Sequence, residues 1–375
     1  MTRHYSILGT NTSIFLLRSA LAIHHVFQKV SAPGMNMMHK KIWQNSITTF
    51  LLFMTGCTNA MSKSTTKFEW EATESAPKHY PMEIIKGTLI FQGEAEKGLY
   101  IPSGGTLTAG WGRAISAHSS GDNPLPLPDR LKIIFFSYGE KQFYKGEFEL
   151  PYEKILTLFR EGVAANKENP TYRRIMVGVA PGGAVAVWVK GVQTTEVFFG
   201  EAQKVVLNPG VAFGLPFESE EQKDAYLAKQ LVNVLNQEEL DSLKKDGIPF
   251  GLWSRYRNLY QWIPTFTDGH SSEQYSVISI NGENKRVNSF TNKEELNEMR
   301  PVPINIGFHT MMNGEKYVYI VNFDEVEMME AFEKLGANRQ MVRIEFDPQL
   351  PRSHTKIRLY NDKESIELKK FKIKD

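Results

Sequence analysis

Residues 128–159 read PDRLKIIFFSYGEKQFYKGEFELPYEKILTLF, and the spacing of apolar residues in this segment predicts the basic structural unit of the chain. Its apolar side chains alternate at Leu131, Ile133 and Phe135, which is the spacing of a strand with one buried face. A second strand rich in aromatic residues follows, and Pro151 then precedes an amphipathic segment. Proline is favoured in the first turn of a helix, because the N–H groups there have no partner within the helix. The stretch therefore predicts a hairpin followed by a helix.

The same pattern returns in the second half of the chain. Equal distances along the sequence separate Pro128 from Pro301, and Phe135 from Phe308. In each copy two further strand-like segments follow the helix, so each copy reads as hairpin, helix, hairpin. The sequence therefore predicts an α+β fold of two related ββαββ units with mainly antiparallel sheets. The alternative is chance similarity between two amphipathic stretches of the same kind.

A helical connector is expected between the two units. Ser219 and Asn236 each precede a helical pattern, and both residue types are favoured at the N-cap of a helix. The expected organisation has five segments. They are a signal region at 1–56 (with an over-extended gene start at 1–34), a tether at 57–67, an N-terminal α+β domain at 68–216, a helical and aromatic connector at 217–265, and a C-terminal α+β domain at 266–375.

Cys57 is the only cysteine in the chain, and it follows an apolar segment at residues 47–54. Basic residues precede this segment and the small residues Thr55 and Gly56 end it, as in a bacterial lipoprotein signal. Translation from Met35 would give this signal a normal length. We therefore expect cleavage before Cys57 and attachment of diacylglycerol to its thiol.

The residue after the cysteine bears on the destination of such a lipoprotein. Many enteric-type bacteria place Asp there to retain a lipoprotein at the inner membrane, whereas this chain has Thr58. Each buried CH₂ of an acyl chain contributes about 0.8 kcal/mol, so several chains form a permanent anchor. We expect an outer-membrane protein that faces the periplasm and contacts the membrane through lipidated Cys57. The alternative is a buried free cysteine that follows a core helix.

The composition describes an ordinary globular chain, with 41% hydrophobic and 23% charged residues. The formal net charge is +2, and the one dense basic run lies at residues 369–374. Nucleic-acid binding is typical of chains with a broad basic stripe. We therefore expect no nucleic-acid partner.

Motifs of common enzymes do not occur in this sequence. It contains no G-x-S-x-G, no H-E-x-x-H and no paired C-x-x-C, which are signatures of hydrolases and metal sites. Asp268, His270 and Ser272 gather catalytic residue types in one segment, but a triad is recognised by its geometry. We expect no cofactor, no metal ion and no catalytic residue, and we expect Ser116–Arg130 and Asp268–Ser272 to be surface loops.

The aromatic and basic run at residues 253–262 allows two interpretations. At helical spacing Trp253, Tyr256 and Tyr260 would share one face, which indicates burial between the two halves of the chain. Tyr, Trp and Arg also dominate the centres of protein interfaces, so the run is also a candidate partner surface. The candidate partner-binding residues are Arg255, Arg257, Tyr260, Asp268 and His270.

A series of motifs built from Gly, Pro and aromatic residues extends over most of residues 68–265. They include Ala76-Pro77, Tyr80-Pro81, Gly110-Trp111-Gly112, Glu140 to Tyr144, Val179 to Gly183, Trp188, Trp253 and Tyr256-Arg257. In these motifs the chain resembles the bacterial lipoprotein family known as domain of unknown function 2931. The resemblance implies no reaction and no catalytic residues. Lipoproteins similar to this one are often encoded beside type VI secretion lipase effectors, which implies an immunity protein that binds a toxin.

We therefore expect a non-catalytic periplasmic binder, and specifically an immunity protein that neutralises a secreted antibacterial phospholipase. The first alternative is a scaffold or assembly lipoprotein of the cell envelope without a toxin partner. A periplasmic enzyme is the third possibility. A lipase-like toxin gene beside this one would favour immunity, whereas an isolated gene and an envelope defect on deletion would favour a scaffold.

Overall fold

The computed structural model describes residues 65–119, 121, 123–162, 172–287 and 298–374. The signal region and Cys57 lie outside these residues. Residues Thr66–Asp375 form one compact unit. None of the helices in the described part of the chain has the length and apolar character needed to cross a membrane.

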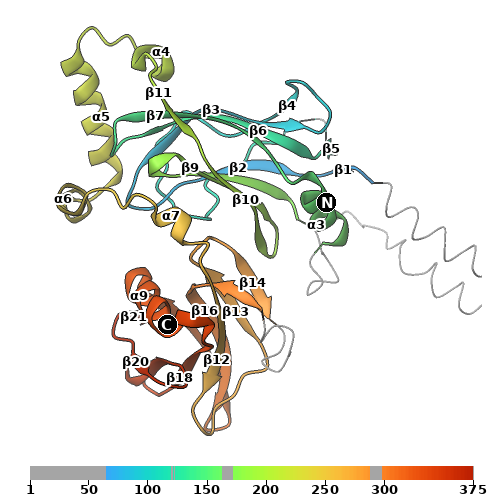
Figure 1. Cartoon of the computed structure of the whole chain (residues 1–375), viewed down its shortest axis with the longest axis vertical. Helices are drawn as coiled ribbons and strands as arrows, with labels where there is room; N and C mark the ends of the chain where they lie inside the picture. Colours follow the sequence, from blue (N-terminus) through green and yellow to red (C-terminus); the bar gives the residue numbers. More distant parts are fainter. Residues whose placement is uncertain (1–64, 120, 122, 163–171, 288–297, 375) are drawn as a thin grey trace, which may run out of the picture. The chain divides into compact units, whose positions relative to one another are not determined.

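The fold is α+β with mostly antiparallel sheets (Figure 1), which confirms this coarser part of the predicted fold class. Within the described residues the largest sheet has nine strands, in the order β2 (Glu71–Ser75), β8 (Arg174–Val179), β9 (Ala184–Lys190), β10 (Thr194–Glu201), β14 (Asn284–Val287), β13 (Tyr275–Ser279), β16 (Pro303–Met312), β17 (Glu315–Phe323) and β21 (Phe371–Ile373). We call it the nine-stranded sheet. It takes strands from both of the predicted α+β segments.

Smaller sheets complete the strand inventory of the described residues. The N-terminal five-stranded sheet has the order β11 (Gln203–Val205), β7 (Gln142–Glu149), β6 (Pro128–Ser137), β3 (Met82–Phe91) and β4 (Gly98–Tyr100). The C-terminal five-stranded sheet has the order β15 (Met299–Pro301), β12 (Leu259–Phe266), β18 (Val342–Asp347), β19 (Lys356–Tyr360) and β20 (Ser365–Glu367). A further pair joins β1 (Lys67–Phe68) to β5 (Leu125–Pro126). Only β2 with β8 and β12 with β18 pair in parallel among the described strands.

Six α-helices lie between these strands in the described chain. They are α3 (Tyr152–Glu161), α4 (Pro209–Phe213), α5 (Glu220–Val234), α6 (Gln237–Asp246), α7 (Leu252–Arg255) and α9 (Glu325–Leu335). The predicted caps are confirmed at two of them. The Ser219 hydroxyl accepts the N–H of Gln222 at the start of α5, and Asn236 forms a reciprocal capping box with Glu239 at α6.

The stretch at residues 128–159 forms the predicted hairpin and helix. In β6 and β7, Phe135 lies opposite Tyr144 and the two rings stack at 5.3 Å. Helix α3 then buries Ile155 and Phe159 in a core between β3 and β6 on one side and β8 and β9 on the other. Burying each such side chain stabilises the fold by about 1.5–3 kcal/mol. The alternating pattern thus forms the inner face of two packed sheets.

A comparable arrangement occurs in the C-terminal half. Phe308 in β16 lies opposite Tyr319 in β17, and their rings also stack at 5.3 Å. Helix α9 follows and buries Met328, Phe332 and Leu335, after which β18 and β19 form an antiparallel pair. The two halves differ in which hairpin belongs to the nine-stranded sheet. In the N-terminal half it is the hairpin after the helix, β8 and β9, whereas in the C-terminal half it is the hairpin before the helix, β16 and β17.

One predicted loop is shorter than expected. The prediction of a loop over Ser116–Arg130 is wrong at its end, because β5 begins at Leu125 and β6 begins at Pro128. Arg130 lies within β6, opposite Glu149 of β7 and Ile90 of β3. Proline is tolerated at the first residue of a strand, so the prolines that suggested a loop do not prevent pairing here.

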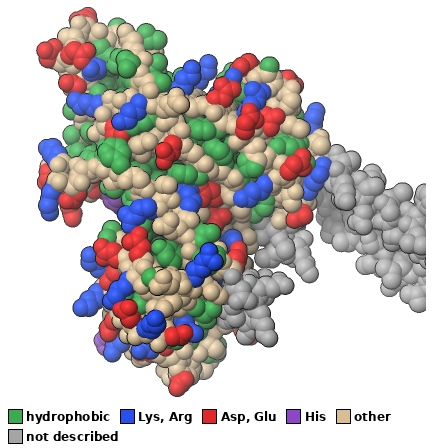
Figure 2. All heavy atoms as spheres, viewed as in Figure 1, with side chains coloured by type: hydrophobic (Ala, Val, Ile, Leu, Met, Phe, Trp, Pro, Cys, Tyr) green, Lys and Arg blue, Asp and Glu red, His purple; other side chains and the backbone are tan. Residues whose placement is uncertain are grey.

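Helices α4 and α5 lie beside the N-terminal five-stranded sheet, near β11, and pack against it (Figure 1). Leu227 of α5 packs with Phe136 and Phe143 of the sheet. The visible face of the molecule carries positive and negative side chains interspersed with hydrophobic ones (Figure 2), in keeping with a net charge near zero.

Candidate functional site

The structure places the predicted partner-binding residues in different surroundings. Arg255 ends α7 and forms an ion pair with Glu333 at 2.7 Å, with the two side chains 53% and 42% exposed. Tyr260 lies on β12, where its ring packs against Phe332 at 5.4 Å. Arg255 is thus on the surface, whereas Tyr260 contributes to packing.

The proposed helical face of the aromatic run is wrong. Helix α7 ends at Arg255, and the chain enters β12 at Leu259. Trp253 and Tyr256 are buried, but Tyr260 follows from the strand rather than from the same helix. Residues from Leu259 onward form a strand rather than a helix because β12 is hydrogen-bonded to β15 on one side and to β18 on the other.

The segment with catalytic residue types forms a loop without triad geometry. The backbone N–H of His270 donates to the carbonyl of Thr267, and the hydroxyl of Ser272 donates to the carbonyl of Gln274. His270 Nδ1 is buried and has no hydrogen-bond partner within the described residues. A Ser–His–Asp triad requires the histidine to bond both the nucleophile and the carboxylate. Asp268, His270 and Ser272 do not form such a chain of bonds among the described contacts.

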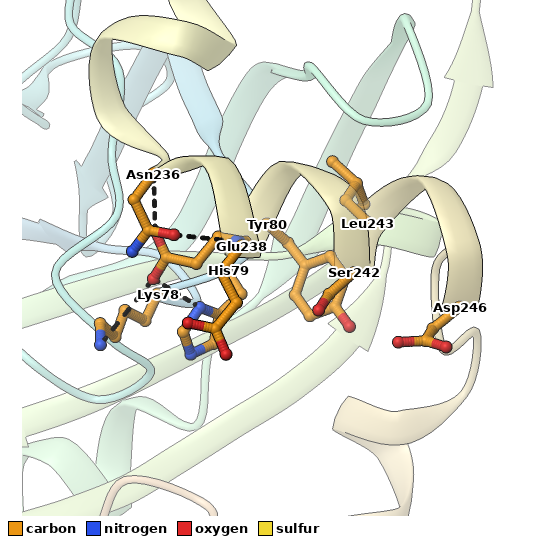
Figure 3. A pocket seen from close by; sticks show the side chains of 9 residues that line it. Lys78, His79, Tyr80, Asn236, Glu238, Ser242, Leu243 and Asp246 are labelled. Carbon is orange, nitrogen blue, oxygen red and sulfur yellow. Dashed lines mark hydrogen bonds and ion pairs between the residues drawn. The ribbon is translucent and has the colours of Figure 1, made fainter.

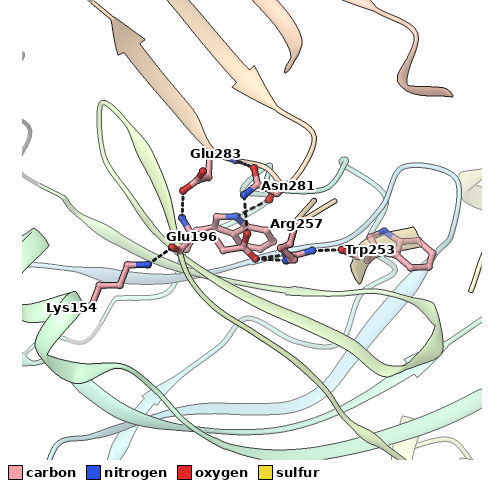
Figure 4. A network of polar contacts seen from close by, with 7 residues as sticks. Lys154, Glu196, Trp253, Arg257, Asn281 and Glu283 are labelled. Carbon is pink, nitrogen blue, oxygen red and sulfur yellow. Dashed lines mark hydrogen bonds and ion pairs between the residues drawn. The ribbon is translucent and has the colours of Figure 1, made fainter. Parts of the chain in front are cut away.

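Arg257 is the predicted residue that the structure places at a mostly buried site. Its Nε lies 2.9 Å from Oε1 of Glu196 in β10, and its Nη2 contacts the same carboxylate. Its Nη1 donates to the carbonyl of Trp253, and its Cζ lies 3.7 Å from the ring centroid of Phe199. The Arg257 and Glu196 side chains are 20% and 10% exposed. Figure 4 shows the guanidinium reaching Glu196 from the segment after α7.

A turn from the C-terminal half completes this network. Nδ2 of Asn281 donates to Oε2 of Glu196 at 2.9 Å, and Oε1 of Glu283 accepts the backbone N–H of Glu196 at 3.1 Å. The indole N–H of Trp188 donates to the carbonyl of Asn281 at 3.0 Å. We call Glu196, Arg257, Asn281 and Glu283 the junction network (Figure 4). It fastens the turn between β13 and β14 to β9 and β10.

Burial works against ionisation of Glu196 and Arg257 in the junction network. It raises the pKa of the Glu196 carboxyl, although Arg257 and Asn281 act in the opposite direction. Burial likewise lowers the pKa of the Arg257 guanidinium against the attraction of Glu196. A buried ion pair contributes little net stability for this reason, yet each partner depends strongly on the other. The network is therefore suited to holding one geometry.

Two glycines allow the backbone on either side to approach closely. Gly112 and Gly282 have φ values of +73° and +90°, and a Cβ on Gly282 would lie 2.7 Å from the Cα of Gly112. Trp111, beside Gly112, packs edge-on against Trp188 at 5.0 Å. The Gly110-Trp111-Gly112 motif thus contacts the Asn281-Gly282 turn.

A separate pocket of about 440 Å³ lies beside α6 (Figure 3). Glu239 contacts Nδ1 of His79 at 3.0 Å and Nζ of Lys78 at 3.9 Å. The same carboxylate accepts the N–H of Asn236, and this bond is the main cause of its lowered pKa. Glu239 is part of the capping box of α6. Its polar contacts therefore stabilise the start of this helix and do not by themselves indicate a binding site. The described residues also contain no group of three or more His, Cys, Asp or Glu placed to hold a metal ion.

Sequence reasoning missed most of the junction network. Glu196, Asn281 and Glu283 are separated from Arg257 by long stretches of chain, and no local motif marks them. Only partial signals mark the network in the sequence: Arg257 lies in the aromatic run, and Asn281-Gly282 is a dipeptide typical of tight turns. Their meeting depends on the pairing of β10 with β14, which joins Thr194 to Asn284.

Comparisons with known proteins give one match. The family model described as "Protein of unknown function (DUF2931)" matches residues 57–251. The match begins at Cys57, contains Trp111 and Glu196, and ends before Arg257. Neither the curated proteins nor the solved structures contain a match to this chain. The family expected from the Gly, Pro and aromatic motifs is confirmed, and the chain belongs to the DUF2931 family.

Proposed function

We propose that this protein is a lipid-anchored, non-catalytic binding protein of the bacterial outer membrane that faces the periplasm. Its partner would be a secreted antibacterial phospholipase, which it neutralises as an immunity protein. The observation that carries the proposal is the family match, because it starts at the cysteine that would accept the lipid. This start is what we expect of a domain that is tethered through Cys57 and works at the membrane surface.

Preformed loops on paired strands support the binding role. The Asp268–Ser272 loop follows β12 and precedes β13, so strands hold both of its ends. Binding loops on a rigid scaffold lose little freedom when they meet a partner. Arg255 is exposed at the end of α7, and Asp268 and His270 lie in the loop. We propose these three residues as partner contacts, while the partial burial and the packing contacts of Arg257 and Tyr260 favour a structural role for both.

We also propose that the two halves contain duplicated ββαββ units. The support is the shared order of elements, with β6, β7, α3, β8 and β9 in one half and β16, β17, α9, β18 and β19 in the other. Phe135 with Tyr144 and Phe308 with Tyr319 occupy equivalent opposed positions and stack in the same manner. One hairpin of each unit enters the nine-stranded sheet.

Expression with the natural signal should rescue cells that export the neighbouring lipase-like toxin to the periplasm. The binder would occupy the toxin before it reaches phospholipid, so survival should return to the level of cells without toxin. Cys57→Ser should remove the thiol that accepts the lipid and release the protein from the membrane fraction, because several acyl chains give its anchor. Colony counts and fractionation measure the two effects.

Two outcomes separate the parts of this proposal. If wild-type expression leaves killing unchanged while the protein reaches the membrane, the immunity role is contradicted and the anchor is retained. If wild-type protein with residue 57 intact stays unacylated in the cytosol, the anchor itself is contradicted. Arg255→Ala should weaken toxin binding, and Arg358→Ala serves as its control, because Arg358 is likewise about half exposed and paired with a glutamate.

A further inference from the structure

A pocket of about 430 Å³ lies on one face of the nine-stranded sheet, next to Trp111. Residues on successive strands form its floor, because each lies directly opposite the next. Arg174 lies opposite Lys190, Lys190 opposite Thr194, and Thr194 opposite Asn284. The row continues through Ile278 of β13 to Asn305 and Asn322.

This row places polar groups at regular intervals. Directly opposed residues point to the same face of a sheet, and neighbouring strands lie about 4.8 Å apart. Six of the seven members are polar: Arg174, Lys190, Thr194, Asn284, Asn305 and Asn322. Sheet faces that pack against another layer are usually apolar, so a polar row lining a pocket is suited to a ligand.

The end of the row at β8 and β9 is positively charged. Arg174 and Lys190 lie side by side there, and Arg113 adds a third cation to the wall. Nε of Arg174 also pairs with Oε2 of Glu71 at 3.1 Å, and both of these side chains remain partly exposed. Nζ of Lys190 bonds the hydroxyl of Thr194 at 3.3 Å, and no carboxylate lies within ion-pair distance of it among the described residues. Burial, and then the charge of Arg174, lower the pKa of Lys190. A bound anion would counter both effects.

Hydrogen-bond donors are also available around the pocket. The indole N–H of Trp111 is buried and has no acceptor in the described part of the chain. Nδ2 of Asn305 donates to Oδ1 of Asn322 at 2.9 Å, which leaves further amide capacity on both residues. Glu325 lines the wall, but its carboxylate accepts the Tyr256 hydroxyl.

We propose that this pocket binds a small molecule with a phosphate or carboxylate group. The oxyanion lies against Lys190, Arg174 and Arg113, and the polar remainder of the ligand lies along Asn284, Asn305 and Asn322. The same chemistry occurs in a free phosphorylated compound and in the headgroup of an anionic phospholipid. The proposal is independent of toxin binding, because the residues lining this pocket include neither Arg255 nor any residue of the Asp268–Ser272 loop.

Calorimetric titration of the full chain in a non-ionic detergent tests this site. The probes are glycerol 3-phosphate, glucuronate and, as the neutral comparison, glycerol. At least one anionic probe should bind saturably and more tightly than glycerol. Lys190→Met should weaken that binding about tenfold or more, the effect of losing a hydrogen bond to a charged group. Lys229→Met removes an exposed lysine of α5 and should leave binding unchanged.

A second variant protects the test against misfolding. Arg113 is exposed, so Arg113→Gln should fold normally and still weaken binding of the anionic probe. Competition by phosphatidylglycerol vesicles, but not by phosphatidylcholine vesicles, would identify a headgroup as the source, and no competition would identify a free ligand. The proposal is overturned if neither anion binds, if glycerol binds equally well, or if folded Lys190→Met and Arg113→Gln bind like the wild type.

Discussion

Arg257→Met should lower the free energy of unfolding by about 3–5 kcal/mol, the usual effect of removing one partner from a buried ion pair. The variant leaves Glu196 mostly buried without its cation, and the carboxylate keeps only the N–H donor of Asn281 for its side chain among the described contacts. Denaturant unfolding followed by tryptophan fluorescence measures the loss. Arg255→Met is the matched control, because its partner Glu333 is exposed and an exposed pair contributes about 0–1 kcal/mol.

Adding Glu196→Gln to Arg257→Met should restore most of the lost stability. The double variant has no charge at positions 196 and 257, and the glutamine amide oxygen can still accept from Asn281. Replacing both partners of a buried pair is often neutral, whereas removing one is not. If the double variant is as unstable as Arg257→Met alone, lost packing against Phe199 rather than the unpaired charge explains the effect.

The deficit of Arg257→Met should also depend on pH. Burial already raises the pKa of Glu196 in the wild type, and loss of the cation would raise it further. A carboxyl whose pKa is higher in the folded than in the unfolded chain favours folding at low pH, and this contribution is lost as the pH rises through the folded pKa. The deficit should therefore be smallest in acid, below the ordinary carboxyl range, and largest at neutral pH.

Local patterns predicted much of the fold. The alternation at Leu131, Ile133 and Phe135 corresponds to buried positions of β6, and capping residues marked the starts of α5 and α6. These features depend on neighbours within one or two turns or along one strand, so the sequence displays them directly. The helical interpretation of Tyr260 failed because pairing with distant strands outweighed a local aromatic spacing.

Local sequence patterns could not predict the junction network, because its members come from distant parts of the chain. Its members come from β10, the segment after α7 and the turn before β14, and the two halves of the nine-stranded sheet meet at the pair Thr194 and Asn284 within the described residues. Which strands become neighbours depends on the packing of whole sheets. A lone glutamate such as Glu196 has no sequence signature until that pairing is known.

The second large effect concerns Gly282, whose replacement by alanine should destabilise the protein by about 2–5 kcal/mol. Its φ of +90° strains any residue with a Cβ, which costs about 1–2 kcal/mol. The added methyl would also lie 2.7 Å from the Cα of Gly112 and 3.2 Å from the ring of Trp188. Such overpacking adds about 1–3 kcal/mol, because neither neighbour is the flexible end of a side chain. The shift in denaturant midpoint measures the total.

Gly269→Ala is the control that separates strain from close approach. Gly269 has a φ of +86°, yet nothing lies within 4 Å of a Cβ built there, so its substitution should show the strain alone. Gly112→Ala should resemble Gly282→Ala, since each glycine makes room for the other. Equal losses for Gly269→Ala and Gly282→Ala would refute the contact. A larger loss at Gly112 and Gly282 would mean that the Gly110-Trp111-Gly112 motif, inside the family match, fixes a turn that lies outside it.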